Sequence, residues 1–137
     1  MKVIYNSRSG KKEGCDEFDY VPLEELFAKS DFISLHIPFD KSQGPTIGAK
    51  EFAMMKDGVF FVNCARGGVV DEAAMLEAIG SGKVAAAAVD VFEQEPTKNE
   101  ALYTNDKISL TPHVGASTGE AQERIGKEIV EIIKSRF

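Results

Sequence analysis

The sequence predicts an α/β fold in which a parallel β-sheet carries helices on both faces. Short apolar runs alternate along the chain with amphipathic segments, at the spacing expected of strand–helix units. The runs at 59–64 and 84–92 are apolar almost throughout, as in strands that are covered on both sides. A chain of 137 residues, 43% of them hydrophobic, suits one domain with one core.

Six apolar runs are expected to form the strands. Each is short and is bounded by polar residues, glycine or proline. In chain order they are 2–6 (KVIYN), 20–21, 32–37 (FISLHI), 59–64 (VFFVNC), 84–92 (VAAAAVDVF) and 108–111. The consecutive alanines of the fifth run leave room for helices that pack closely over the sheet.

Helices are expected between and after these strands, and polar loops at 7–17 and 40–47. Pro22 opens the first helix, which has Leu23, Leu26 and Phe27 on one face. The next helices are a short one at 49–55 and one at 71–79 that is closed by Gly80. A long helix at 118–135 has an apolar stripe of Ile125, Ile129, Ile132 and Ile133.

Composition excludes several functional classes. The net charge of −6 and the isoelectric point near 5.0, without a basic block, argue against a nucleic-acid-binding surface. Cys15 and Cys64 form neither a metal-binding spacing nor a disulfide framework, so we expect no metal site and a reducing compartment. No apolar stretch is long enough for a signal peptide or a membrane span. We therefore expect a cytoplasmic domain without membrane partners.

Chemically capable residues follow the expected strands. Ligands of open parallel sheets bind beyond the carboxyl ends of the strands, so these positions indicate function. In strand order they are Ser7 and Arg8, then Pro38, then Ala65 and Arg66, then Asp90, Glu93 and Glu95, then His113 and Gly115. Singly, Arg66 and Glu95 are ordinary loop residues and His113 could cap a helix, but their convergence on one rim favours a site.

The chemistry of this group is specific. An arginine holds a carboxylate with a bidentate fork. A histidine exchanges a proton with a hydroxyl or carbonyl oxygen, and a nearby carboxylate orients it and favours its protonated form. Together they suit the interconversion of a 2-hydroxy acid and a 2-oxo acid. No side chain supplies a hydride, so a cofactor is required.

Three stretches of the sequence closely resemble the D-isomer-specific 2-hydroxyacid dehydrogenases. They are 23–40 (LEELFAKSDFISLHIPFD), 63–96 (from NCARGG to EQEP) and 110–122 (LTPHVGASTGEAQ). The resemblance covers essentially the whole chain and implies a Rossmann-like domain that binds NAD or NADP. Residues 1–137 would be a part of that domain, with the substrate domain absent.

The resemblance also implies roles for individual residues. Arg66 would bind the substrate carboxylate, His113 would be the acid/base and Glu95 its partner, while Asp90 would bind the nicotinamide carboxamide. The nicotinamide pocket would be lined by Cys64, Ala65, Val114, Gly115 and Ala116. His36 and Pro38 would lie beside the adenine and its ribose, although a buried structural role for His36 is an open alternative.

The substrate and the cofactor are less sharply defined. The ending GASTGEAQERIG is most like phosphoglycerate dehydrogenases, and glyoxylate and hydroxypyruvate reductases are the alternative. Ser7 and Arg8 stand where NAD-using members of the family place an acidic residue, which favours NADP. In the other interpretation, Arg8 is simply a loop cation.

One departure from the family concerns the phosphate site. The GxGxxG turn and the strand before it are missing, which would leave a gap between 2–6 and 32–37. The gap could persist, close to a flavodoxin-like strand order, or be filled by a second chain, and we expect a homo-oligomer. A catalytically silent fold module is thus the rival hypothesis to an enzyme. A flavodoxin-like binding protein is less favoured, because no Ser/Thr/Gly phosphate loop follows the first strand.

Overall fold

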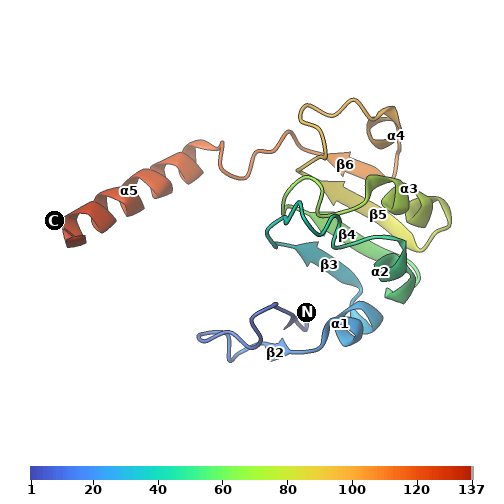
Figure 1. Ribbon diagram of the computed structural model, residues 1–137, viewed down its shortest axis with the longest axis horizontal. Helices are drawn as coiled ribbons and strands as arrows, with labels where there is room; N and C mark the ends of the chain where they lie inside the picture. The colour runs from blue at the N-terminus through green and yellow to red at the C-terminus, as the bar shows by residue number, and fades with distance from the viewer. Residues whose placement is uncertain (137) are drawn as a thin grey trace.

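The computed structural model describes residues 1–136 and contains two separate parallel sheets (Figure 1). The strands are β1 (Ile4–Tyr5), β2 (Asp19–Tyr20), β3 (Phe32–Leu35), β4 (Val59–Asn63), β5 (Val84–Val89) and β6 (Ile108–Leu110). The helices are α1 (Leu23–Lys29), α2 (Ala49–Met54), α3 (Glu72–Gly80), α4 (Glu100–Tyr103) and α5 (Gly119–Arg136). All six expected strands and the four expected helices are present, and α4 is an additional helix.

The larger sheet has the order β3-β4-β5-β6, with every pair parallel. Its register aligns the carboxyl ends of the strands, because Leu35 pairs with Asn63, Asn63 with Val89 and Val89 with Leu110. The segments that follow β3, β4, β5 and β6 therefore leave the sheet at one rim. The expected α/β class with a parallel sheet is confirmed.

The helices cover one face of this sheet. Ile33 and Leu35 of β3 point into the core, where they join Phe27, Phe52, Met75 and Leu102 from α1 to α4. On the opposite face Phe32 is 63% exposed and stacks on the exposed ring of Phe60, with a centroid distance of 4.8 Å. The expectation of helices on both faces is thus met on one face only in residues 1–136. The apolar composition of a strand indicates that both of its faces favour burial, but it does not identify which helix or other element covers each face.

Local sequence explains where the helices begin. The Asp71 carboxylate accepts a hydrogen bond from the Ala74 amide at 3.0 Å and so caps α3. Before α2, the Glu51 carboxylate accepts from the Gly48 amide at 2.9 Å. Helix α4 has only four residues, too few to show a helical period, so the sequence did not reveal it. Its Leu102 is nevertheless fully buried.

Strands β1 and β3 do not pair, and the gap between them persists. A hollow of about 910 Å³ separates them, lined by residues of β1, β2 and β3 together with Val62 of β4. Strand β1 instead pairs in parallel with β2, with the Tyr5 and Tyr20 rings in contact and an exposed ion pair between Lys2, just before β1, and Asp19. The flavodoxin-like closure considered from the sequence is therefore not adopted.

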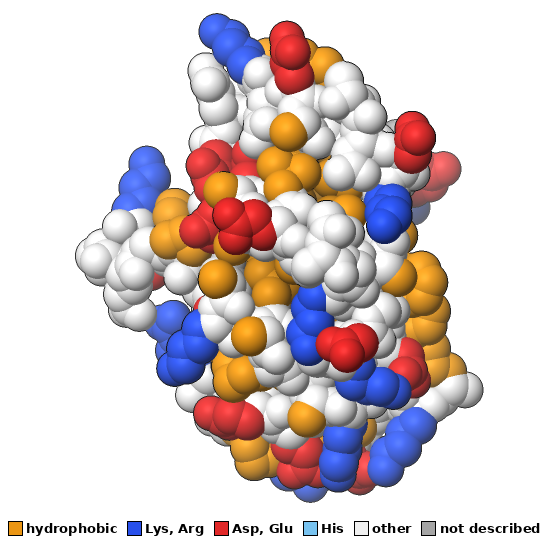
Figure 2. All heavy atoms as spheres, turned by 90° about the vertical axis from the view of Figure 1, so that its right-hand side faces the viewer, with side chains coloured by type: hydrophobic (Ala, Val, Ile, Leu, Met, Phe, Trp, Pro, Cys, Tyr) orange, Lys and Arg blue, Asp and Glu red, His pale blue; other side chains and the backbone are white. Residues whose placement is uncertain are grey.

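Helix α5 extends away from the rest of the chain (Figure 1). Its apolar stripe of Ile125, Ile129, Ile132 and Ile133 lies between 41% and 53% exposed, and only Ala121 is buried. In residues 1–136, none of the helices combines the length and apolar character needed to cross a bilayer. On the face shown in Figure 2, acidic and basic side chains are intermixed among small apolar patches.

Candidate active site

A histidine–carboxylate pair lies at the carboxyl rim of the sheet. Nδ1 of His113 is 2.9 Å from Oε2 of Glu95. The other carboxylate oxygen, Oε1, accepts a hydrogen bond from the Phe92 amide at 3.1 Å. The imidazole of His113, and after it the Phe92 amide, holds the pKa of the Glu95 carboxyl below its usual value. Glu95 therefore carries a negative charge at neutral pH, in a fixed orientation.

The strand register brings these two residues together. Val89 and Leu110 are paired at the ends of β5 and β6, so the segments that follow them leave the sheet side by side. Glu95 lies on the first segment and His113 on the second. His113 has a φ of +51°, in the left-handed region that residues with a side chain seldom occupy. Its backbone conformation is therefore imposed by its surroundings.

Asp90, at the end of β5, joins the same two segments. Only 8% of the residue is exposed, and its Oδ1 accepts from the Thr111 hydroxyl at 2.6 Å and from the Val114 amide at 3.0 Å. Burial acts to raise the pKa of Asp90, but the Thr111 hydroxyl and the amides of Val114 and Gly115 outweigh it. The pKa lies below its usual value, and the buried carboxyl is ionised at neutral pH.

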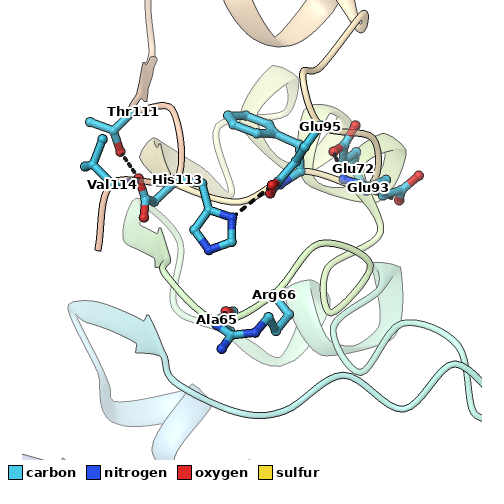
Figure 3. Close-up of polar contacts among 10 residues, drawn as sticks. Ala65, Arg66, Glu72, Glu93, Glu95, Thr111, His113 and Val114 are labelled. Carbon is cyan, nitrogen blue, oxygen red and sulfur yellow. Dashed lines mark hydrogen bonds and ion pairs between the residues drawn. The ribbon is translucent and has the colours of Figure 1, made fainter. Parts of the chain in front are cut away.

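Arg66 lies on the adjacent loop, directly after β4. Figure 3 shows the His113 ring between Glu95 and the loop that carries Arg66. The arginine is exposed and donates from Nη1 to the Ala65 carbonyl at 2.6 Å. The buried Asn63 shapes this loop, because its Oδ1 accepts from the Ala65 amide at 3.1 Å. The predicted convergence of Arg66, Glu95 and His113 on one rim is thus present in the structure.

A glycine lets the Arg66 loop approach the Glu95 segment. A Cβ atom built on Gly67 would overlap the backbone carbonyl of Phe92. Because this neighbour is backbone rather than a flexible side chain, it cannot move aside at low cost. Gly67 therefore sets the spacing between the loop of Arg66 and the segment of Glu95.

Two glutamates, Glu72 of α3 and Glu93 of the segment after β5, lie side by side (Figure 3). The Glu93 amide donates to Oε1 of Glu72 at 3.0 Å, and the Glu72 amide donates to Oε1 of Glu93 at 3.4 Å. Asn99 also donates to Glu72, at 3.1 Å. The start of α3 and the segment after β5 are thereby fastened to each other.

The residues expected to contact the nicotinamide follow β4 and β6, the two strands on either side of the strand that leads into Asp90. Cys64 is exposed, as are the consecutive residues Val114, Gly115 and Ala116, while Ala65 is buried. A Cβ atom on Gly115 would lie 3.8 Å from Oδ2 of Asp90. A carboxylate oxygen accepts hydrogen bonds from amide N–H groups, so the chemistry of Asp90 fits the carboxamide of a nicotinamide.

The other expected cofactor residues follow β1 and β3. Ser7 hydrogen-bonds through its hydroxyl to that of Ser9 at 3.2 Å, and Arg8 is exposed. The hydroxyl and amide of Ser42 hold the pKa of Asp40 below its usual value, and the positive charge of Arg8 adds to this effect. The charge of Arg8 thus acts on the loop after β3, although β1 and β3 are not paired.

His36 and Pro38 are both exposed at this part of the rim. Nε2 of His36 lies 2.8 Å from the Ser34 hydroxyl. The alternative of a buried structural role for His36 is wrong, because the core-facing positions of β3 are Ile33 and Leu35 and the chain then turns into the loop.

Some residues that shape the site were not singled out from the sequence. Asn63 and Thr111 act through hydrogen bonds to loops whose paths the sequence does not specify. A hollow of about 410 Å³ also lies beside the His113–Glu95 pair, lined mainly by Phe92, Pro96, Thr97, Leu110 and Pro112. Within residues 1–136, no group of three or more His, Cys, Asp or Glu side chains is arranged to hold a metal ion.

Known proteins share both the sequence and this architecture. A hydroxypyruvate reductase from Thermotoga maritima is 52% identical over 136 residues, which are 97% of this chain and 44% of the relative. A D-3-phosphoglycerate dehydrogenase from Sus scrofa is 48% identical over 120 residues, 85% of this chain and 22% of the relative. The chain thus spans less than half the length of these relatives.

A solved structure of a known dehydrogenase has a similar fold and a related sequence. The D-lactate dehydrogenase from Aquifex aeolicus, complexed with NAD and lactic acid, matches with a TM-score of 0.83 and 35% identity. The match covers 98% of this chain and 46% of that one. Residues 1–115 also match the family model described as D-isomer specific 2-hydroxyacid dehydrogenase, NAD binding domain. The chain therefore belongs to the D-isomer specific 2-hydroxyacid dehydrogenase family.

Proposed function

We propose that this chain forms part of the NAD(P)-binding domain of an enzyme that interconverts a D-2-hydroxy acid and a 2-oxo acid. The observation that carries the proposal is the His113–Glu95 pair, 2.9 Å apart, beside the loop of Arg66. These three residues are the proposed catalytic group. The substrate would be a small 2-hydroxy or 2-oxo acid, as the names of the relatives also suggest.

Each member of the group has a distinct task in the proposed mechanism. The guanidinium of Arg66 binds the substrate carboxylate and so directs the reacting carbon toward His113. His113 donates a proton to the carbonyl oxygen during reduction and takes it back from the hydroxyl during oxidation. Glu95 fixes the ring through Nδ1, which leaves Nε2 for the substrate, and its negative charge stabilises the imidazolium.

A bound nicotinamide supplies or accepts the hydride in this reaction. Residues of this chain would hold it on the rim next to His113. The Oδ2 oxygen of Asp90 would accept a hydrogen bond from the carboxamide N–H. Cys64, Ala65 and the residues Val114, Gly115 and Ala116 would contact the ring.

For the cofactor, we propose a preference for NADP over NAD. Ser7 and Arg8 follow β1, and a hydroxyl and a guanidinium suit a ribose 2′-phosphate. Pro38 and His36 would lie beside the adenine ribose. The Arg8 side chain is exposed, which leaves its guanidinium accessible to a phosphate.

Two kinds of substrate are candidates, each with its own observation. The ending GASTGEAQERIG favours 3-phosphoglycerate, whereas the 52% identity to the Thermotoga relative favours hydroxypyruvate, with glyoxylate as a smaller analogue. Steady-state kinetics on a complete enzyme that carries this segment, with all three acids and both cofactors, tests the proposal. We expect turnover of at least one of these acids, whereas turnover of none would contradict the proposed reaction.

We further propose that the chain associates with itself. The unpaired edges of β1 and β3, the exposed Phe32–Phe60 pair and the apolar stripe of α5 all offer surface to a second copy. Sedimentation velocity over a range of protein concentrations tests this. A single monomeric species at every concentration would contradict it.

A further inference from the structure

Thr111 lies two residues before His113 and contacts neither Arg66 nor Glu95 through any hydrogen bond of the described residues. Its hydroxyl is instead 2.6 Å from Oδ1 of Asp90. The same oxygen accepts the Val114 amide at 3.0 Å. Asp90 thus accepts hydrogen bonds from both sides of His113, from Thr111 before it and from Val114 after it.

We propose that Thr111 is a positioning residue for the acid/base histidine: its hydroxyl fixes the Asp90 carboxylate, which in turn fixes the turn that carries His113. This inference rests on the proposed function, because it assigns Thr111 a part in the same reaction. Thr111 acts through Asp90 and does not touch the substrate.

The backbone of His113 shows why such a restraint is needed. Its φ of +51° lies in the left-handed region, which residues with a side chain occupy uncommonly, so contacts that hold this turn stabilise it. The Glu95 contact holds the ring but acts only through the side chain. The Asp90 hydrogen bonds act on the turn itself, so the two restraints together fix both the backbone and the ring.

A buried carboxylate can do this only if its own orientation is fixed. Asp90 is 8% exposed and therefore has few water molecules to orient it. Within residues 1–136, Thr111 is the only side chain that donates a hydrogen bond to the Asp90 carboxylate, and the other donors are amides of the turn that is to be positioned. Thr111 itself is anchored to the sheet, because its amide donates to the Val89 carbonyl at 3.1 Å. The hydroxyl thus ties the carboxylate, and through it the turn, to the end of the sheet.

The first arm of the test is kinetic and uses a complete enzyme that carries this segment. Thr111→Val keeps the shape of the side chain and removes the hydroxyl, whereas Thr111→Ser keeps the hydroxyl. We expect Thr111→Val to lower kcat by between about tenfold and a hundredfold, as for a misplaced catalytic group, with little change in the KM for the oxo acid. Thr111→Ser is expected to restore kcat to within about threefold of the starting enzyme.

Thr104→Val is the matched control. The Thr104 hydroxyl also makes one short hydrogen bond, to the Glu100 carbonyl at 2.7 Å, but it lies at the end of α4. Its loss tests the general effect of removing a threonine hydroxyl, and kcat is expected to stay unchanged. If Thr111→Val and Thr104→Val have the same kcat, the positioning role is wrong.

The second arm does not depend on turnover. In the 137-residue chain labelled with ¹⁵N, the exchange rate of the Val114 amide with water reports whether Asp90 holds the turn. We expect Thr111→Val to raise this rate by about tenfold and Thr111→Ser to leave it near that of the original chain. An unchanged rate in Thr111→Val would overturn the inference. If the original enzyme turns over none of the acids, the proposed function fails, and the Val114 exchange rate still decides whether Thr111 fixes the turn.

Discussion

Nδ1 of His113 lies 2.9 Å from Oε2 of Glu95, although 18 positions separate the two residues in the sequence. The contact arises because β5 and β6 are neighbouring parallel strands whose last residues are paired. A histidine and a carboxylate at this distance interact electrostatically and also fix each other's orientation through a hydrogen bond. The pH dependence of the site is therefore the most direct consequence of the fold.

Glu95→Gln tests that charge. We expect the acidic arm of the pH–rate profile for hydroxy-acid oxidation to shift, because the amide removes the negative charge that lies beside Nδ1 of His113. The pKa of Glu95 is depressed in the folded chain, so the contribution of the pair to stability is complete above the usual glutamate value. It is lost as the pH falls through the lowered pKa. Steady-state rates between pH 4 and pH 9 measure the shift.

The matched control is Glu123→Gln. Glu123 forms an exposed ion pair with Lys127 at 2.6 Å on α5, away from the site. This variant loses the same charge and is expected to keep the original pH–rate profile. If both variants shift the profile equally, the effect is one of net charge and not of the His113 contact.

Arg66→Ala and His113→Ala are expected to affect different kinetic constants. The guanidinium binds the carboxylate in the ground state and in the transition state alike, so its loss chiefly raises the KM for the acid. Proton transfer occurs only during the reaction, so His113→Ala lowers kcat, by about 10²- to 10⁴-fold. An unchanged kcat in His113→Ala would refute the assignment of the acid/base.

Much of this arrangement could be predicted from the sequence. The rim that gathers Arg66, Glu95 and His113 follows from three neighbouring parallel strands, because the carboxyl ends of parallel strands share an edge. The contacts of Thr111 and Asn63 could not be predicted, since they depend on the path of loops without a periodic pattern. The short helix α4 was missed for the same reason. The bare sheet face around Phe32 was not foreseen, because composition does not identify the covering element.

Gly67→Ala tests the close approach of the two catalytic loops. The added methyl group would overlap the Phe92 carbonyl, so the loop of Arg66 must move away from the segment of Glu95. We expect the free energy of unfolding to fall by about 1–3 kcal/mol, as for overpacked sites, and the KM for the acid to rise. Chemical denaturation of both proteins measures the change in stability.

Gly126→Ala is the control for this substitution. Gly126 lies within α5 and has no atom within 4 Å of an added Cβ. The same methyl group is expected to raise the free energy of unfolding there, by up to about 1 kcal/mol, because alanine is the better helix former. Equal effects of the two substitutions would contradict the steric explanation at Gly67.

Arg8→Asp is expected to reverse the cofactor preference of a complete enzyme. The guanidinium would lose a charge-assisted contact with the 2′-phosphate, worth about 1.5–3 kcal/mol, and the new carboxylate would accept from the 2′-hydroxyl of NAD. The ratio of kcat/KM for NADP to that for NAD measures the change. Arg124→Asp on the exposed α5 alters the net charge equally and is expected to leave the ratio unchanged. Equal use of both cofactors by the original enzyme would count against the preference.

The 137-residue chain itself is expected to bind dinucleotides only weakly. A dinucleotide is held chiefly through its pyrophosphate, which requires backbone amides at a glycine-rich turn or a helix start. The sequence has no GxGxxG turn after a strand, and the place between β1 and β3 where that strand would lie is a hollow of about 910 Å³. The other residues that would contact a dinucleotide, from Arg8 at its adenine end to Asp90 at its nicotinamide end, are few, and most of them are exposed.

We therefore expect this chain to bind NADP or NAD with a Kd no tighter than about 1 mM. Isothermal titration calorimetry on the purified chain tests this: millimolar or undetectable binding fits a catalytically silent module, whereas micromolar binding of either dinucleotide would show that other residues of this chain hold the pyrophosphate.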